Sequence, residues 1–345
     1  MSDKKPIIKH LVIPGGGPTG IQALGALQQL ERKGYWKREN IETIYATSAG
    51  AILSLLIALP FDWEAINDYI ILRPWHETYN VTASQIFDAF SKKGLFDISV
   101  LETFYKPFFD AKDLSIAMTM QEFYKFSHIE LHFFTLELNS FEIIDVSYKT
   151  FPNTPVLQCI HMSCAIPMIF APVCIDNKCF VDGGIVANYP LKICVEQHPE
   201  NVDEIFGLRN VYETDSNMVE NNIVNNESTI LDYLVHFVMK LIRHADTCEK
   251  MTVTIPNELS YPTTWMNFSN LKDTLYSREK RKALLDKGIV AGDAFLNEMT
   301  YINEMTYINE MTYINEMTYL NEMVETDLNK MTETVVEETN LNDGV

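Results

Sequence analysis

The chain has 345 residues and carries 27 Lys and Arg against 47 Asp and Glu, which gives a formal net charge of −20 at pH 7. This negative charge repels the phosphates of DNA and RNA and weakens adsorption to anionic lipid, so nucleic acid is excluded as the main partner. With 47% hydrophobic residues, the chain is long enough to form one large globular domain with a sizeable core.

The N-terminal residues lack the apolar segment of a secretory signal. The polar run Met1-Ser2-Asp3-Lys4-Lys5-Pro6 leads directly into a strand-like segment, and no apolar stretch reaches the roughly 20 residues of a membrane-spanning helix. We therefore expect a cytoplasmic protein, at most peripherally bound to a membrane. Its six cysteines are predicted to be reduced thiols rather than a disulfide framework.

The first predicted strand, Leu11-Val12-Ile13, runs into the glycine-rich segment 15–20. A helix follows, with apolar residues at helical spacing and a stop at Gly34. Strand, glycine turn and helix are also the layout of a dinucleotide site, which needs an acidic residue at the end of the second strand. Here the second strand ends in Ser48, which favours an oxyanion-binding loop.

Ser48 lies in the segment Ala46-Thr47-Ser48-Ala49-Gly50, between a predicted strand and an apolar helix over 51–59 that ends before Pro60. A serine among small residues on a sharp strand-to-helix turn is typical of the G-x-S-x-G nucleophile elbow. Taken alone, the segment fits a helix N-cap or a small packing residue equally well.

The middle third is predicted to add helices and two hairpins to the sheet. They are helices near 63–72 and 83–92 with N-caps at Asp62 and Thr82 and a stop at Gly94, a hairpin of 131–138 and 141–146, a helix opening at Thr154 and Pro155, and a hairpin turning at Asp176-Asn177. The second hairpin brings Asp182 to the end of a strand. Sites of α/β sheets lie at the carboxyl ends of their strands.

Four segments together resemble the patatin-like phospholipases, lipid acyl hydrolases that use a Ser-Asp dyad on an α/β fold. In chain order they are the glycine loop 15–20, the elbow 46–50, the run 163–172, and Asp182-Gly183-Gly184 followed by Asn188 and Pro190. The resemblance covers about residues 9–296. It implies a three-layer α/β fold with a central, mostly parallel sheet flanked by helices.

The resemblance also assigns roles to residues. It implies Ser48 as nucleophile, Asp182 as base, and the backbone of the glycine loop as oxyanion hole, with no cofactor and no metal. The partner would be a lipid ester, with no obligate protein partner, and the reaction a phospholipase A-type cleavage. The loop residues are Gly15, Gly16 and Gly17, and the motif-supporting residues are Gly20, Ala46, Ala49, Gly50, Gly183 and Gly184.

Three positions depart from the family's usual pattern. Pro14 stands where the family often has Asp, Thr19 where it usually has Arg, and Ala46 where the elbow usually begins with Gly. None of these changes removes a reacting group. Thr19 and Ala46 leave open an alternative function, a lipid-binding or scaffolding protein with weak or no turnover.

Two further alternatives concern histidine and cysteine. A Ser-Asp-His triad stays open because His198, His236 and His244 follow Asp182, although none lies in a recognisable motif. A zinc site is the less common reading of the cysteine-rich run 159–179, because its C-x4-C pairs differ from the usual C-x2-C. The residues concerned are Cys159, Cys164, Cys174 and Cys179, beside His161.

The segment 230–243 places apolar residues on one helical stripe with Lys240, Arg243 and His244 near its end. The stripe residues are Ile230, Leu231, Leu234, Val235, Val238, Leu241 and Ile242. Such a helix either packs on the core, which is the commoner arrangement, or faces a membrane or covers a site as a lid.

The last fifty residues repeat Asn-Glu-Met-Thr-Tyr-Ile from Asn297 through Leu320. Six residues advance a helix by about 600°, so no apolar stripe persists along it. We expect a catalytic domain over 1–296 and a low-complexity tail over 297–345 that is at most partly helical and dispensable for the chemistry.

Overall fold

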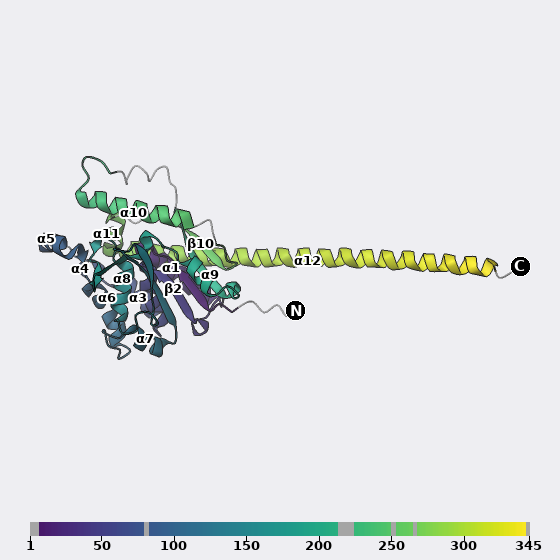
Figure 1. The fold of residues 1–345 in the computed structure, drawn as a ribbon, viewed down its shortest axis with the longest axis horizontal. Helices are drawn as coiled ribbons and strands as arrows, with labels where there is room; N and C mark the ends of the chain where they lie inside the picture. The colour runs from purple at the N-terminus through teal and green to yellow at the C-terminus, as the bar shows by residue number, and fades with distance from the viewer. Residues whose placement is uncertain (1–6, 79–82, 213–223, 250–252, 265–267, 343–345) are drawn as a thin grey trace. The chain divides into compact units, whose positions relative to one another are not determined.

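The computed structural model describes residues 7–78, 83–212, 224–249, 253–264 and 268–342. The chain divides into two compact units, Met1–Asp293 and Ala294–Val345. The first unit is built around a sheet with helices on both sides (Figure 1). No helix among the described residues combines the length and the apolar character needed to cross a bilayer.

The main sheet has the strand order β10-β9-β1-β2-β4-β8-β7, with β5 also paired to β4. The five strands from β10 to β4 are parallel, whereas β5 and β8 run antiparallel to β4 and β7 antiparallel to β8. A second small sheet pairs β3 with β6. The strands are β1 His10–Ile13, β2 Thr43–Thr47, β3 Gly94–Phe96, β4 Glu130–Glu137, β5 Glu142–Val146, β6 Met168–Phe170, β7 Val173–Ile175, β8 Lys178–Asp182, β9 Ile205–Tyr212 and β10 Glu258–Thr263.

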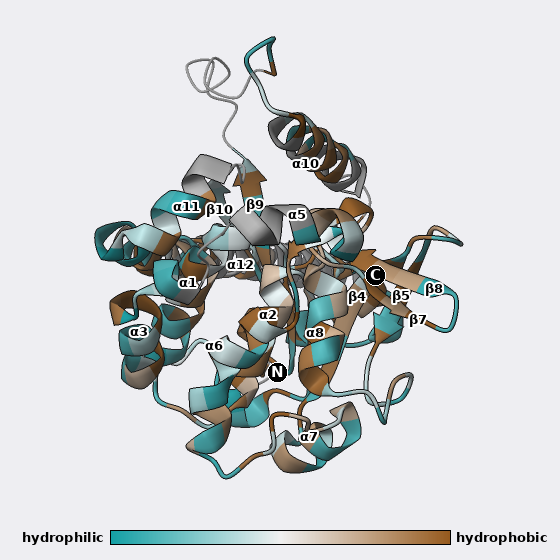
Figure 2. Cartoon of the chain, turned by 90° about the vertical axis from the view of Figure 1, so that its left-hand side faces the viewer, coloured by the Kyte–Doolittle hydropathy of each residue, from teal (hydrophilic) through white to brown (hydrophobic). Residues whose placement is uncertain are grey.

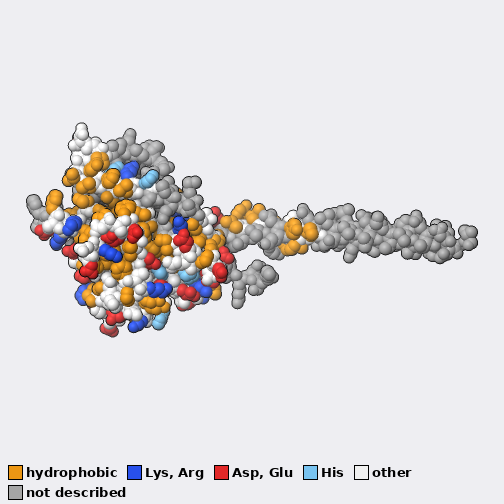
Figure 3. All heavy atoms as spheres, in the orientation of Figure 1, with side chains coloured by type: hydrophobic (Ala, Val, Ile, Leu, Met, Phe, Trp, Pro, Cys, Tyr) orange, Lys and Arg blue, Asp and Glu red, His pale blue; other side chains and the backbone are white. Residues whose placement is uncertain are grey.

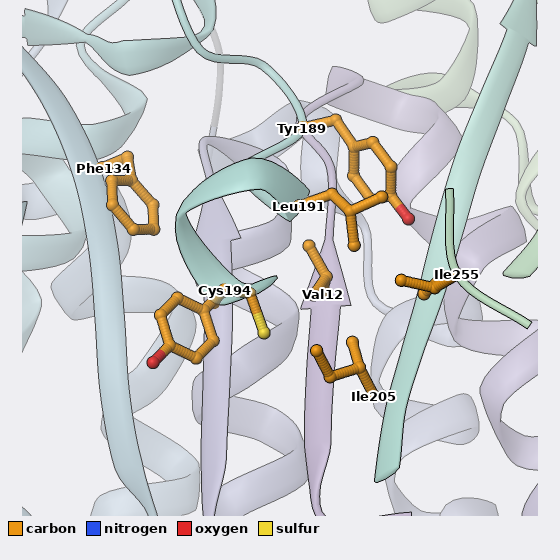
Figure 4. Packing of buried hydrophobic residues seen from close by; sticks show 8 residues of the cluster. Val12, Phe134, Tyr189, Leu191, Cys194, Ile205 and Ile255 are labelled. Carbon is orange, nitrogen blue, oxygen red and sulfur yellow. The ribbon is translucent and has the colours of Figure 1, made fainter. Parts of the chain in front are cut away.

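Helices lie on both faces of this sheet, which explains why every residue of β1 and β2 is buried. Figure 4 shows α9 in front of the strands, packed on Val12 and Phe134, with further helices behind them. The helices are α1 Gly20–Arg32, α2 Ala49–Ala58, α3 Trp63–Leu72, α4 Trp75–Thr78, α5 Ala83–Lys92, α6 Ser99–Asp110, α7 Met120–Ser127, α8 Val156–Cys164, α9 Leu191–Gln197, α10 Ile230–Glu249, α11 Phe268–Tyr276 and α12 Arg278–Asn342. Short 3-10 turns are η1 Gly17–Thr19, η2 Arg38–Asn40, η3 Gly183–Ile185 and η4 Val202–Glu204.

This architecture confirms the predicted fold class. The predicted strands and helices of the first 60 residues are β1, α1, β2 and α2, and the two predicted hairpins are β4–β5 and β7–β8. Asp62 caps α3 by accepting a hydrogen bond from the N–H of Ala65. The cap predicted at Thr82 lies outside the described residues.

The β7–β8 turn shows why its residues were recognisable. Asp176 and Asn177 have positive φ angles of 48° and 63°, which is the geometry of the two-residue type I′ hairpin that these side chains tolerate. The turn sets Cys174 directly opposite Cys179, and the two form a disulfide. The prediction that all six cysteines are reduced thiols is therefore wrong for this pair.

The first turns of α12 belong to the first unit. The buried guanidinium of Arg281 donates hydrogen bonds to the carbonyls of Ile71, Arg73 and Thr274. A Cβ at Gly288 would clash with the carbonyl of Gln22 in α1, so glycine permits the close approach of the two helices.

The second unit, Ala294–Val345, is helical up to Asn342. The prediction of a tail that is at most partly helical is therefore wrong. The repeat is rich in Glu and Met, and no Gly or Pro interrupts residues 293–342, so intrinsic helix propensity supports the helix without a persistent apolar stripe.

Candidate active site

Two strands meet end to end beside β4, and this arrangement creates the site. β2 runs parallel to β4 and ends with Thr47 opposite Phe134, whereas β8 runs antiparallel to β4 and ends with Asp182 opposite Thr135. Because Phe134 and Thr135 are consecutive, the carboxyl ends of β2 and β8 face each other. The hydroxyl of Ser48, which follows Thr47, donates a hydrogen bond of 2.6 Å to Oδ2 of Asp182.

Ser48 stands on a strained turn between β2 and α2. Its φ of 54° and ψ of −122° are rarely adopted by a residue with a side chain, and such outliers are typical of nucleophile elbows. A side chain at Gly50 would clash with the carbonyl of Ile13, so the elbow needs glycine there. The smaller departure at Ala46 is accommodated inside β2, where Ala46 is fully buried.

Two residues at the end of α8 hold the backbone of the elbow. Ser163 Oγ accepts a hydrogen bond from the N–H of Ser48 at 2.9 Å, and Cys164 Sγ donates to the carbonyl of Ser48 at 3.1 Å. The predicted run 163–172 therefore begins with direct contacts to the elbow. The resemblance identified this run but assigned no role to either side chain.

Asp182 is 1% exposed, and burial raises the pKa of its carboxyl group to about 7, although hydrogen bonds from Ser48 and Gly184 oppose this rise. Its second oxygen, Oδ1, accepts a hydrogen bond of 2.7 Å from the N–H of Gly184. A side chain at Gly183 would clash with the carbonyl of Phe134. The two glycines thus allow the chain to turn sharply after Asp182 while fixing the carboxylate.

The glycine loop lies next to Ser48, and two asparagines hold its backbone. The N–H of Gly15 donates to the carbonyl of Asn188 at 3.0 Å, and the carbonyl of Gly15 accepts from Nδ2 of Asn210 at 2.7 Å and of Asn188 at 3.3 Å. Thr19, at the position where the family usually has Arg, donates from its hydroxyl to the carbonyl of Gly16 at 2.9 Å. This hydrogen bond fixes the loop backbone.

Gly16 is the N-cap of η1 and Gly17 is its first residue. Backbone N–H groups at the start of a helix have no partner within the helix and point out of its end. Both glycines line the same pocket as Ser48 and Asp182. Gly15 differs from Gly16 and Gly17, because its N–H donates a hydrogen bond to the carbonyl of Asn188.

The pocket above the dyad has a largely apolar wall. Ile166 comes from the segment after α8, and Met239 and Ile242 come from α10. The polar residues Asn188 and Tyr212 also line the pocket. Ser48 is only 6% exposed and lines this pocket.

Among the described residues, none of the histidines considered for a triad lines the pocket that contains Ser48 and Asp182. His198 stacks on His10 with ring centroids 3.7 Å apart, and its Nε2 lies 3.0 Å from the hydroxyl of Tyr45. His236 and His244 belong to α10. Within the described part of the chain, no hydrogen bond joins a histidine to Ser48 or Asp182.

The cysteines considered for zinc do not converge either. Cys174 and Cys179 form a disulfide, Cys164 faces the carbonyl of Ser48, and Nε2 of His161 lies 2.7 Å from the carbonyl of Ala171. Across the described ranges, no group of three or more His, Cys, Asp or Glu side chains is arranged to hold a metal ion.

Sequence comparisons identify distant relatives of the chain. The chain is 25% identical over 197 residues to the probable lipid hydrolase 463L of Invertebrate iridescent virus 6, which covers 56% of this chain and 66% of the relative. It is 24% identical over 239 residues to the uncharacterized protein R571 of Acanthamoeba polyphaga mimivirus. This alignment covers 68% of this chain and 76% of R571. The chain thus spans about two thirds of the viral lipid hydrolase.

Solved structures give weaker likenesses. VipD from Legionella pneumophila is 16% identical, with a TM-score of 0.49 over 85% of this chain and 67% of VipD. ExoU from Pseudomonas aeruginosa is 13% identical, with a TM-score of 0.41 over 85% of this chain and 53% of ExoU. The family model described as patatin-like phospholipase matches residues 11–195, more than half of the chain, and this match contains Ser48, Asp182 and the glycine loop. The chain therefore belongs to the patatin-like phospholipase family.

Proposed function

We propose that the protein is a serine carboxylic-ester hydrolase that acts in lipid degradation, with Ser48 as nucleophile and Asp182 as base. The observation that carries this proposal is the 2.6 Å hydrogen bond from Ser48 Oγ to Asp182 Oδ2, two residues that line one pocket. Membership of the patatin-like family and the similarity to a probable lipid hydrolase support it.

In the first half of the reaction, Ser48 Oγ attacks the carbonyl carbon of the ester while Asp182 accepts its proton. The N–H groups of Gly16 and Gly17 stabilise the negative charge that develops on the carbonyl oxygen. We leave Gly15 out of this oxyanion hole because its N–H donates to Asn188. The tetrahedral intermediate collapses, and Asp182 returns the proton to the departing alcohol.

In the second half, water attacks the acyl-enzyme. Asp182 takes a proton from the water, the same N–H groups hold the second oxyanion, and the fatty acid leaves as Ser48 regains its proton. A pKa of about 7 suits both roles of Asp182, since the group can accept and return a proton near neutral pH.

The pocket wall favours an apolar acyl group over a polar one. Ile166, Met239 and Ile242 present hydrocarbon surface beside Ser48, and burying an acyl chain there removes apolar area from water. We therefore propose a glycerophospholipid or related lipid ester as substrate, cleaved in the manner of a phospholipase A. The chemistry is assigned to residues 1–296, with the tail 297–345 dispensable.

Covalent labelling provides the direct test. The purified protein is expected to react with a fluorophosphonate and to hydrolyse short-chain acyl esters, and Ser48→Ala is expected to abolish both. A matched control is Ser54→Ala, which removes another buried serine hydroxyl, bonded to the carbonyl of Gly50 within α2. A folded wild type that neither reacts nor hydrolyses would support the alternative of a lipid-binding or scaffolding protein.

A further inference from the structure

Helix α10 presents apolar side chains on two sides. On its inner side, Val238 and Met239 pack against the buried cluster of β3, α6 and β6. Met239 and Ile242 also line the pocket above Ser48. The helix contacts η3, which directly follows Asp182, and β6. One side of α10 is therefore accounted for by the core and the site.

The other side of α10 is exposed although it is apolar. Ile230 is 73% exposed, Tyr233 and Phe237 are each 52% exposed, and Leu241 is 41% exposed. At about 100° per residue, these four positions fall within an arc of about 80°. We call them the outer stripe. Figure 3 shows hydrophobic side chains gathered over this helix, and Figure 2 shows their alternation with polar residues along α10.

A basic residue, Lys240, flanks the outer stripe. Lys240 is exposed and precedes Leu241 by one position; at about 100° per residue it falls about 20° outside the arc, beside Tyr233, and so lies on the border of the stripe. Amphipathic helices that lie in a membrane interface combine an apolar face with Lys or Arg at its border, which reach the headgroup phosphates, and with aromatic rings at headgroup level. The outer stripe has all of these features, including Tyr233.

We propose that the outer stripe binds the surface of a zwitterionic phospholipid membrane and holds the mouth of the pocket against it. The choice of a lipid surface rests on the proposed function, because a lipid ester has to reach Ser48 from a bilayer. The stripe and the pocket wall belong to one helix, so the apolar surface continues from the membrane contact to Met239 and Ile242. A zwitterionic surface fits better than an anionic one, because the chain as a whole carries a net charge of −20.

Cosedimentation with phosphatidylcholine vesicles tests the proposal independently of catalysis. The wild type and Ser48→Ala are expected to sediment equally with the vesicles. The double variant Phe237→Gln, Leu241→Gln is expected to partition at least about tenfold more weakly, since two large side chains no longer leave water. Neither Phe237 nor Leu241 lines the pocket, so the double variant is expected to hydrolyse a dispersed short-chain ester at the rate of the wild type.

Phe141→Gln is the matched control, because this phenylalanine is 61% exposed on the β4–β5 turn, outside the outer stripe. It is expected to sediment like the wild type. The proposal is overturned when the wild type fails to sediment, when the double variant sediments as well as the wild type, or when Phe141→Gln is equally impaired. A wild-type dimer that the double variant converts to a monomer also overturns it, since a second copy then covers the stripe.

Ester hydrolysis and vesicle sedimentation are measured separately, so the proposed function and the membrane surface are tested independently. Stripe-dependent sedimentation of a protein that hydrolyses no ester would remove the proposed function and keep the membrane surface. Ester hydrolysis by a protein that does not sediment with vesicles would keep the proposed function and remove the membrane-binding role of the outer stripe.

Discussion

The hydroxyl of Ser163 joins the nucleophile elbow to the central strand. It accepts from the N–H of Ser48 at 2.9 Å and donates to the carbonyl of Phe134 at 2.6 Å. Ser163 is fully buried, so no water can replace either hydrogen bond without rearrangement. The strained φ of Ser48 is thereby supported from α8 as well as from α2.

Ser163→Ala is expected to leave both partners unpaired. We expect a loss of about 1–3 kcal/mol in the free energy of unfolding and a fall in kcat of roughly 10- to 100-fold, because Ser48 is no longer held in the attacking geometry. Denaturant unfolding and steady-state kinetics measure the two effects. Ser54→Ala serves as the control, and equal losses of kcat in both variants would mean that Ser163 acts only through general stability.

The activity is expected to rise with pH across neutrality. The proposed base works only when ionised, and burial raises the pKa of Asp182 to about 7, so kcat/KM falls as the pH drops below that value. This limb coincides with that of an ordinary histidine, so the pH profile must be combined with substitution. Asp182→Asn is expected to remove nearly all activity.

The histidine variants decide between dyad and triad. His198→Ala, His236→Ala and His244→Ala are each expected to keep most of the kcat/KM of the wild type toward a dispersed ester. A folded but inactive protein among these three would replace the dyad with a triad.

Asp182→Asn is also expected to change stability in a pH-dependent way. A carboxyl whose folded pKa is raised stabilises the fold below its unfolded pKa of 3.8, and this contribution is lost as the pH rises through about 7. The side-chain amide that replaces the carboxyl group in this variant does not ionise, so the variant does not lose stability as the pH rises. The variant should therefore gain of the order of 1–4 kcal/mol over the wild type at about pH 9, and much less at about pH 5. Melting temperatures that run parallel at both pH values would contradict this account.

Truncation after residue 296 is expected to leave ester hydrolysis and the melting temperature nearly unchanged. The anchoring contacts of α12, those of Arg281 and Gly288, all precede this point. A shorter protein that ends before Arg281 is the contrasting variant, and it should unfold readily. A large loss of activity on removing 297–345 alone would show that the repeats contribute to the fold.

The contact between Ser48 and Asp182 could be anticipated because both residues lie in short motifs whose physical requirements are local. A strained elbow needs small neighbours, and a sharp turn after Asp182 needs glycine. Asn210 could not be predicted in this way. Its role depends on the pairing of β9 with β1, which joins residues almost 200 positions apart in the chain and leaves no local pattern.

Two other features depended on register and environment rather than on pattern. The count of cysteines did not reveal that the hairpin register sets Cys174 opposite Cys179. The apolar positions of 230–243 predicted a helix, but periodicity alone does not tell which side meets the core. Ile230 and Leu241, both on the predicted stripe, are exposed, whereas Ile242 is buried.

Because the carboxyl ends of β2 and β8 face each other beside β4, a register error in β8 would separate Ser48 from Asp182. The two strands are not paired with each other, so the distance between Ser48 and Asp182 depends on the register of each strand on β4, together with the hydrogen bonds that the end of α8 and Ala165 make to the two residues. A slip of β8 by one residue would move Asp182 by about 3.3 Å and turn its side chain to the opposite face of the sheet. Phe180 and Val181, which are buried in β8, would change faces as well. Such a misaligned molecule would keep its helices and could not be told from the native protein by its helix content, although Ser48 and Asp182 would no longer meet.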